Sequence, residues 1–271
     1  MLAAPAPATL TPVVDHLKKG AERFGDRVDV AKEAMGDRVD AAREAMGDRV
    51  DAATDALAAI KPRLRGVTHE WAFFISLFLG AALIVAADSA RATLAASIYA
   101  VSLSALLGTS ALYHRINWRR PEVRRWMRRL DHTMIFILIA GTTTPFALLV
   151  MEGALADAVL IAVWGGAAAG IVVELIWIEA PKWVTAIVYL AIGVGVGALA
   201  FPQMLEHAGV AAAALIAGGG ALYVAGAVIY AAQRPDPNPA VFGYHEIFHV
   251  LVLAAAAAHF AAVAFFALPA A

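Results

Sequence analysis

From Trp71 onward the chain is dominated by apolar runs long enough to cross a membrane. A helix rises about 1.5 Å per residue, so about 20 apolar residues span a hydrocarbon core of roughly 30 Å. Seven segments meet this requirement: residues 70–88, 92–114, 131–151, 158–178, 183–201, 209–232 and 243–268. Hydrophobic residues make up 61% of the chain. We therefore expect an all-α fold, a seven-transmembrane helix bundle in the plasma membrane.

Basic residues mark one side of this expected bundle. Arg91 is the one base from residue 61 onward on the opposite side. The others precede the first segment or fall in the even-numbered connections: Lys61, Arg63, Arg65, Arg115, Arg119, Arg120, Arg124, Arg125, Arg128, Arg129, Lys182 and Arg234. Cytoplasmic loops carry an excess of Lys and Arg. The asymmetry predicts a cytoplasmic N-terminus and a C-terminus outside the cell.

Residues 1–61 are predicted to be a separate cytoplasmic arm, and residues 62–271 the membrane domain. The arm repeats Gly-Asp-Arg-Val-Asp every 11 residues, at positions 25–29, 36–40 and 47–51. An 11-residue apolar repeat corresponds to about 3.67 residues per turn, which indicates an amphipathic helix. Two interpretations remain open. The arm is solvated and partly disordered, or it lies on the membrane surface or self-associates.

Composition excludes several classes of function. A formal net charge of -1 argues against general affinity for nucleic acid. The absence of cysteine excludes disulfides, thiolate ligands and cysteine nucleophiles. The N-terminus has no basic start followed by an apolar core, so no cleaved signal peptide is expected. Any metal site must use histidine, carboxylate and water.

Histidines gather at one end of the expected bundle. His245 and His249 are four residues apart and share one helix face. The second segment ends, and the third and seventh begin, at the same leaflet, which brings His114 and Asp131 to similar depth. Three neutral imidazoles, from His114, His245 and His249, would leave the fourth position of a zinc ion for water. The competing interpretation is that intramembrane histidines pack helices by hydrogen bonding.

Two further residues are candidates for catalysis at such a zinc site. Asp131 could accept a proton from water, or could simply cap the third helix. Ser110, one turn before His114, could bind water or a developing oxyanion, or could bond back to its own helix. The pattern His-Glu-x-x-His is also that of soluble metalloproteases, with Glu246 as the base, or Glu246 could orient a ligand.

The remaining histidines have simpler interpretations. His132 and His259 are expected to form hydrogen bonds that pack helices. His16, His69 and His207 fall at or outside the expected helix ends, where solvent would satisfy their ring nitrogens.

Three blocks of sequence together resemble the bacterial hemolysin III family. They are Ser110-x-x-x-His114, Leu130-Asp131 with Ala140-Gly141-Thr142-Thr143-Thr144-Pro145, and His245-Glu246-Ile247-Phe248-His249 followed by His259-Phe260. Residues 62–66, Pro-Arg-Leu-Arg-Gly, also resemble its start. The family is grouped with the progestin and adipoQ receptors and is more distantly similar to alkaline ceramidases. The resemblance implies zinc bound by His114, His245 and His249, with Ser110 and Asp131 beside it, and does not cover the arm.

The leading hypothesis is a zinc-dependent, hydrolase-like membrane protein that cleaves or senses an acyl-chain lipid at the cytoplasmic leaflet. Its expected reaction is hydrolysis of a lipid amide, because the receptor branch of the family resembles amidases acting on lipids. The bacterial branch is named for membrane lysis, so a pore-forming protein with a structural zinc is the alternative. A receptor without turnover, signalling through the arm, is a third hypothesis, and an intramembrane protease is the least favoured.

Overall fold

The computed structural model describes residues 62–177 and 182–271, except for the side chains of residues 182–186. It divides the chain into two units, residues 1–60 and residues 61–271. In the first unit only seven residues are described: Lys32, Met35, Gly36, Arg38, Val39, Ala42 and Met46. Each of these is helical and exposed. The predictions for the rest of the arm lie outside the described residues.

The membrane domain is built from helices. Their bounds are α2 Val67–Val85, α3 Ala90–Arg115, α4 Pro121–Leu149, α5 Gly153–Ile176, α6 Lys182–Gln203, η1 Met204–Ala208, α7 Gly209–Ala232, α8 Tyr244–Ala262, η2 Val263–Ala267 and η3 Leu268–Ala270. No strand longer than an isolated bridge, Asn238 to Phe242, occurs within the described ranges. The all-α prediction is confirmed.

Six stretches of helix in the described part are long and apolar enough to cross a membrane. Their outward faces carry large apolar side chains, including Trp71, Phe78 and Ile161, which are 68–77% exposed. Contiguous exposed apolar surface on this scale is what a hydrocarbon environment accommodates. The chain is therefore a multi-pass membrane protein. One stretch, Ile187–Ala232, contains α6, η1 and α7 in 46 residues, and the predicted count of seven spans stays a prediction.

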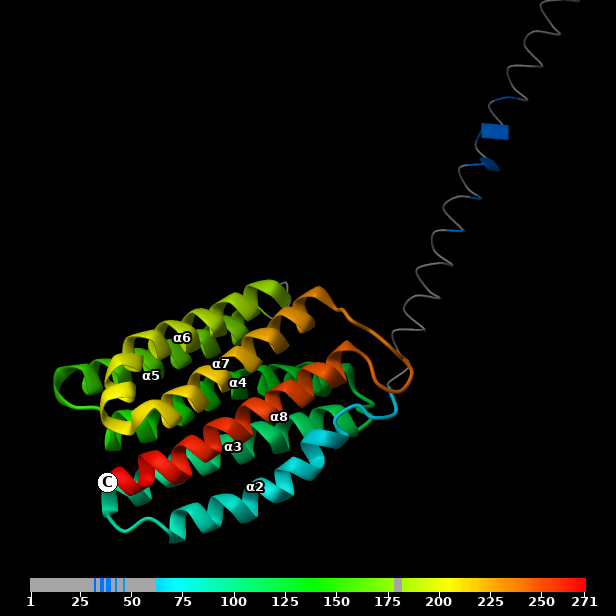
Figure 1. Cartoon of the computed structure of the whole chain (residues 1–271). Helices are drawn as coiled ribbons and strands as arrows, with labels where there is room; N and C mark the ends of the chain where they lie inside the picture. Colours follow the sequence, from blue (N-terminus) through cyan, green and yellow to red (C-terminus); the bar gives the residue numbers. More distant parts are fainter. Residues whose placement is uncertain are drawn as a thin grey trace, which may run out of the picture. The chain divides into compact units, whose positions relative to one another are not determined.

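The helices form a closed ring. Each helix packs against the next along the chain, α8 returns to α2, and α4 also contacts α6 across the bundle. Figure 1 shows α2 on one side of the bundle and α5 and α6 on the other. Helices approach closely where a small residue allows it. Gly170 of α5 faces the ring of Phe136 of α4, and a Cβ at position 170 would overlap that ring. Because of this arrangement the inner faces of α3, α4, α6, α7 and α8 can share one interior space.

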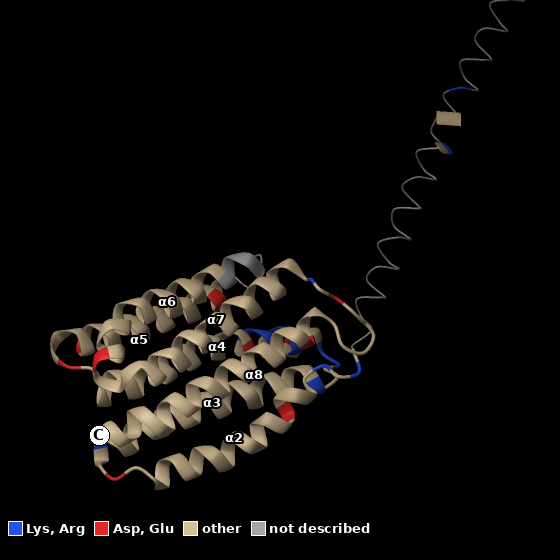
Figure 2. Cartoon of the chain, viewed as in Figure 1, with Lys and Arg blue, Asp and Glu red and all other residues tan. Residues whose placement is uncertain are grey.

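The expected connection between the second and third segments is shorter than predicted. α4 begins at Pro121, ten residues before the predicted start at 131, so Arg124 and Arg128 lie on the helix. Proline at the first helical position has a fixed φ suited to the helix and no N–H to satisfy there. Figure 2 shows Lys and Arg gathered at the end where α3 ends and α4 and α8 begin.

Candidate functional site

His114, His245 and His249 meet inside the bundle at the end of α3 and the start of α8. Their ring centroids form a nearly equilateral triangle, with sides of 4.7, 5.0 and 4.7 Å. One ring nitrogen from each lies within 4.8 Å of the other two. His114 and His249 are buried, and His245 is half-buried. The structure therefore brings together the three histidines that the sequence predicted as metal ligands.

The geometry of these nitrogens fits a metal ion. Nε2 of His114 lies 3.3 Å from Nε2 of His245. Two nitrogens bound at about 2.0–2.1 Å to a tetrahedral ion are themselves about 3.3–3.4 Å apart. Nδ1 of His249 is buried and has no hydrogen-bond partner among the described residues. A buried histidine triad of this kind could hold a metal ion.

The two predicted catalytic residues lie beside the triad. Oδ2 of Asp131, on α4, is 3.7 Å from Nε2 of His114. Ser110 is 3% exposed and lies one turn before His114 on α3. The Ser110 hydroxyl also interacts with the Asp131 carboxylate. Both predicted neighbours are therefore next to the histidine cluster.

His69 is a fourth histidine at this site, and the prediction that solvent satisfies it is wrong. It lies in the first turn of α2 and is 2% exposed. Its ring stacks on that of His249 with centroids 3.9 Å apart and planes 8° from parallel. Its Nδ1 is 2.8 Å from Oγ of Ser110. The signal available in the sequence was depth: α2 begins at the same end of the bundle as α4 and α8.

Glu246 holds the start of α8 in place. It is 2% exposed, and its carboxylate forms an ion pair with Nε of Arg65. Its second oxygen accepts a hydrogen bond of 2.8 Å from the backbone N–H of Gly243, which caps the helix. Both carboxylate oxygens are thus engaged by structural partners. This arrangement favours the positioning interpretation of Glu246 over the protease interpretation, in which it would act as a base.

Residues 63–66, which we call the entry segment, connect α2 to the metal-site helices. Backbone N–H groups of Arg63 and Leu64 donate to the carbonyls of Ala240 and Val241, at 3.0 and 3.2 Å. Gly66 has φ of 77°, and a Cβ there would lie 2.6 Å from Cβ of His114. Only glycine combines this left-handed backbone with such close contact. The entry segment therefore contacts α3 and pairs with the loop that precedes α8.

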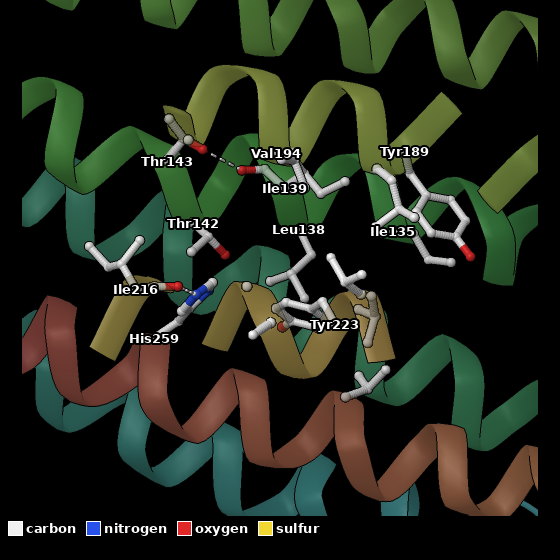
Figure 3. A pocket seen from close by; sticks show the side chains of 18 of the residues that line it. Ile135, Leu138, Ile139, Thr142, Thr143, Tyr189, Val194, Ile216, Tyr223 and His259 are labelled. Atoms are coloured by element: carbon white, nitrogen blue, oxygen red, sulfur yellow. Dashed lines mark hydrogen bonds between the residues drawn. The ribbon is translucent and has the colours of Figure 1, made fainter. Parts of the chain in front are cut away.

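A cavity of about 750 Å³ opens beside the triad. This volume lies in the range of about 300–1,000 Å³ typical of ligand sites. His245, His249, Ser110 and Asp131 line one end of it. The other lining residues are mostly apolar, and Figure 3 shows side chains of α4, α6 and α7, among them Leu138, turned into this space.

Comparison with known proteins identifies the chain's relatives. The family model described as Haemolysin-III related matches residues 57–260. The chain belongs to this family. It is 30% identical over 206 residues to Hemolysin-3 of Bacillus cereus, covering 75% of this chain and 90% of that protein. It is 31% identical over 170 residues to the Hemolysin-3 homolog of Bacillus subtilis (strain 168), covering 63% and 76%.

A vertebrate relative extends the comparison. The chain is 27% identical over 199 residues to the monocyte to macrophage differentiation factor of Homo sapiens, which covers 72% of this chain and 80% of that protein. Both bacterial and human relatives are thus similar to the membrane domain of this haemolysin-III-related protein. The family match begins at residue 57, so residues 1–56 of the arm lie outside it.

The two histidines predicted to pack helices do so. His259 donates from Nε2 to the carbonyl of Ile216, at 3.1 Å, and joins α8 to α7 (Figure 3). His132 of α4 lies 2.6 Å from the carboxylate of Glu174 on α5. These hydrogen bonds confirm the prediction of polar contacts between helices.

We expect Arg65 and Glu246 to contribute to stability as a pair in this haemolysin-III-related protein. Replacing either residue with glutamine leaves the other charge without its partner and should cost about 1–3 kcal/mol. The double variant Arg65→Gln/Glu246→Gln should lose little more stability than either single variant, because the effects of substituting two residues of one ion pair are not additive. Thermal unfolding of the purified protein in detergent would measure this, and losses that simply add would contradict the pairing.

We expect His69 to orient His249 and Ser110. The variant His69→Ala removes both contacts and should weaken metal binding, probed with Zn²⁺, by about 10- to 100-fold, as for other residues that support metal ligands. His69→Phe keeps a ring on His249 and should lose less. Competition with a chelator would measure the affinities, with His207→Gln as a control because His207 bonds to Val150 instead. Unchanged affinity in His69→Ala would show that His69 does not position the ligands.

Proposed function

We propose that this chain is a zinc-dependent membrane hydrolase that releases the acyl chain of a lipid amide at the cytoplasmic leaflet. One observation carries the proposal. One cavity is lined at once by polar residues of the site and by mostly apolar side chains. The polar residues are His245, His249, Ser110 and Asp131. A carbonyl held near the histidines could therefore keep its acyl chain within the bundle. The family membership and the convergence of the three histidines support this reading.

The protein's own residues suit amide hydrolysis. His114, His245 and His249 would hold the ion, which when bound supplies a Lewis acid for the carbonyl and makes water more acidic. Asp131 would accept the proton of the attacking water. The Ser110 hydroxyl is held by His69 and contacts the Asp131 carboxylate. Once Asp131 has taken the proton of water, this hydroxyl would turn to donate a hydrogen bond to the developing oxyanion. The apolar wall would exclude bulk water and strengthen these interactions.

The second candidate is a pore-forming protein in which zinc only joins helices. A structural zinc site is closed by four protein ligands, whereas a catalytic site keeps one position open. Within the described ranges, the residues that could share one ion are three histidines, with no fourth ligand among them. This donor set supports the hydrolase over the structural alternative. The bacterial relative is named Hemolysin-3, so the pore-forming function is included as the alternative outcome of the experiment below.

We expect Asp131→Asn to separate binding from turnover. The amide keeps the size of the side chain but cannot accept the proton, so release of fatty acid should fall about 10²- to 10⁴-fold while zinc stays bound. The measurement uses full-length protein in liposomes, incubated with a bacterial lipid extract and analysed for free fatty acid. His249→Ala should lose both zinc and release.

The matched control is Asp157→Asn, because Asp157 is an exposed residue of α5. It should retain both zinc and fatty-acid release. Zinc-loaded wild type that releases no fatty acid, yet lets dye leak from liposomes, would contradict the hydrolase and support the pore-forming alternative.

The seven-span topology is part of the proposal. The stretch Ile187–Ala232 has 46 residues, which at about 1.5 Å per residue is about 69 Å, twice the thickness of a hydrocarbon core. Reversal at η1 would give two spans and seven in total. The basic residues at the end holding the histidines would then face the cytoplasm. The predicted arm would then be cytoplasmic as well, and we propose that it binds the membrane surface or another copy of the chain.

A further inference from the structure

A part-buried hydrogen-bonded pair, His132 and Glu174, lines the metal-site cavity from a second pair of helices. Nδ1 of His132, on α4, lies 2.6 Å from Oε1 of Glu174, on α5. Glu174 is 5% exposed within an otherwise apolar helix. Both residues line the cavity of about 750 Å³ that also contains His245 and His249. A carboxylate at such a place is costly unless a partner or a ligand compensates its charge.

The pair leaves hydrogen-bonding capacity unused. A carboxylate has two oxygens and can accept about four hydrogen bonds. In the described part of the chain, His132 is the hydrogen-bond partner of Glu174 and uses Oε1. Since Nδ1 of His132 serves this contact, its Nε2 is left, and the His132 side chain is 24% exposed. Oε2 of Glu174 and Nε2 of His132 are therefore available to a molecule in the cavity.

The position of His132 and Glu174 relative to the triad determines which part of a bound lipid would contact them. His132 directly follows Asp131, whose carboxylate lies 3.7 Å from His114, so both polar groups lie at the same depth along α4. Phe146, another cavity residue of α4, is 14 positions after His132, about 21 Å along the helix. The cavity thus extends along α4 from the level of the pair to Phe146. An acyl chain extending toward Phe146 would leave the polar head beside His132 and Glu174.

We propose that His132 and Glu174 form the headgroup subsite of this cavity, and that it takes a head that donates hydrogen bonds, a hydroxyl or an ammonium. The subsite rests on the proposed function in one respect, because it assumes that an acyl lipid occupies the cavity. The negative Glu174 carboxylate attracts such donors and repels a carboxylate or phosphate head. Arg128 also lines the cavity, and its guanidinium is the group that would favour an anionic head instead.

The test compares two lipids that share one acyl chain. The full-length, zinc-loaded protein in detergent is titrated with N-oleoylethanolamine, which has a hydroxyl head, and with N-oleoylglycine, which has a carboxylate head. Wild type should bind the hydroxyl lipid at least tenfold more tightly. Glu174→Gln keeps the size of the side chain and removes its charge, so it should reduce this preference at least fivefold, chiefly by improving binding of the carboxylate lipid.

Two further variants make the result decisive. His132→Asn should also reduce the preference, and it serves if Glu174→Gln does not fold. Glu152→Gln changes an exposed residue outside the cavity and should keep the wild-type preference. Equal binding of the two lipids by wild type would overturn the proposal, as would an unchanged preference in folded Glu174→Gln. Tighter binding of the carboxylate lipid would also overturn it and would assign the selectivity to Arg128.

Binding and cleavage are scored separately. Headgroup preference without release of oleate would support the subsite and contradict the hydrolase proposal. Release of oleate from both lipids, with no difference in binding or rate, would support the hydrolase and contradict the subsite.

Discussion

Three imidazole rings buried together in an apolar bundle impose the constraint on which the rest of this structure depends. Each buried ring nitrogen must find a partner, because an unsatisfied polar group away from water is costly. Nε2 atoms of His114 and His245 only 3.3 Å apart, with the buried ring of His249 beside them, share one small space that a single ion can satisfy. The surrounding contacts hold these three rings in position.

Those contacts come largely from the first turn of α2 and the entry segment. Arg65 pairs with Glu246, between the two histidines of α8, and Gly66 lies against His114 of α3. His69 stacks on His249 and contacts Ser110. One short stretch of chain therefore touches both helices that carry the triad. Metal-site geometry and the packing of α2 should be coupled for this reason, since a shift of α2 would disturb His114 and His249 together.

The site was predicted from the sequence where local periodicity and membrane depth determined it. The i,i+4 spacing places His245 and His249 on one face of α8, and counting segments brings His114 and Asp131 to the same leaflet. A position near a helix start predicts solvent exposure for His69, but its ring stacks on that of His249. Depth alone does not reveal such stacking.

Contacts between residues far apart in the chain are also not predicted by the sequence. Arg65 and Glu246 are 181 positions apart, and His132 and Glu174 are 42 apart. No periodic pattern relates them, since they are joined only when the ring of helices closes. The early start of α4 differs from the prediction for another reason: a cluster of arginines is typical of a loop, whereas here Pro121 begins the helix that carries them.

We propose that His114, His245 and His249 bind one zinc ion and leave one coordination position open. X-ray absorption at the zinc edge, combined with metal analysis of the purified chain, tests this most directly. We predict one zinc per chain with three imidazole ligands and one oxygen, and loss of the metal in His114→Ala. Absence of zinc from correctly folded protein would contradict the claim, and four protein ligands would contradict the open position.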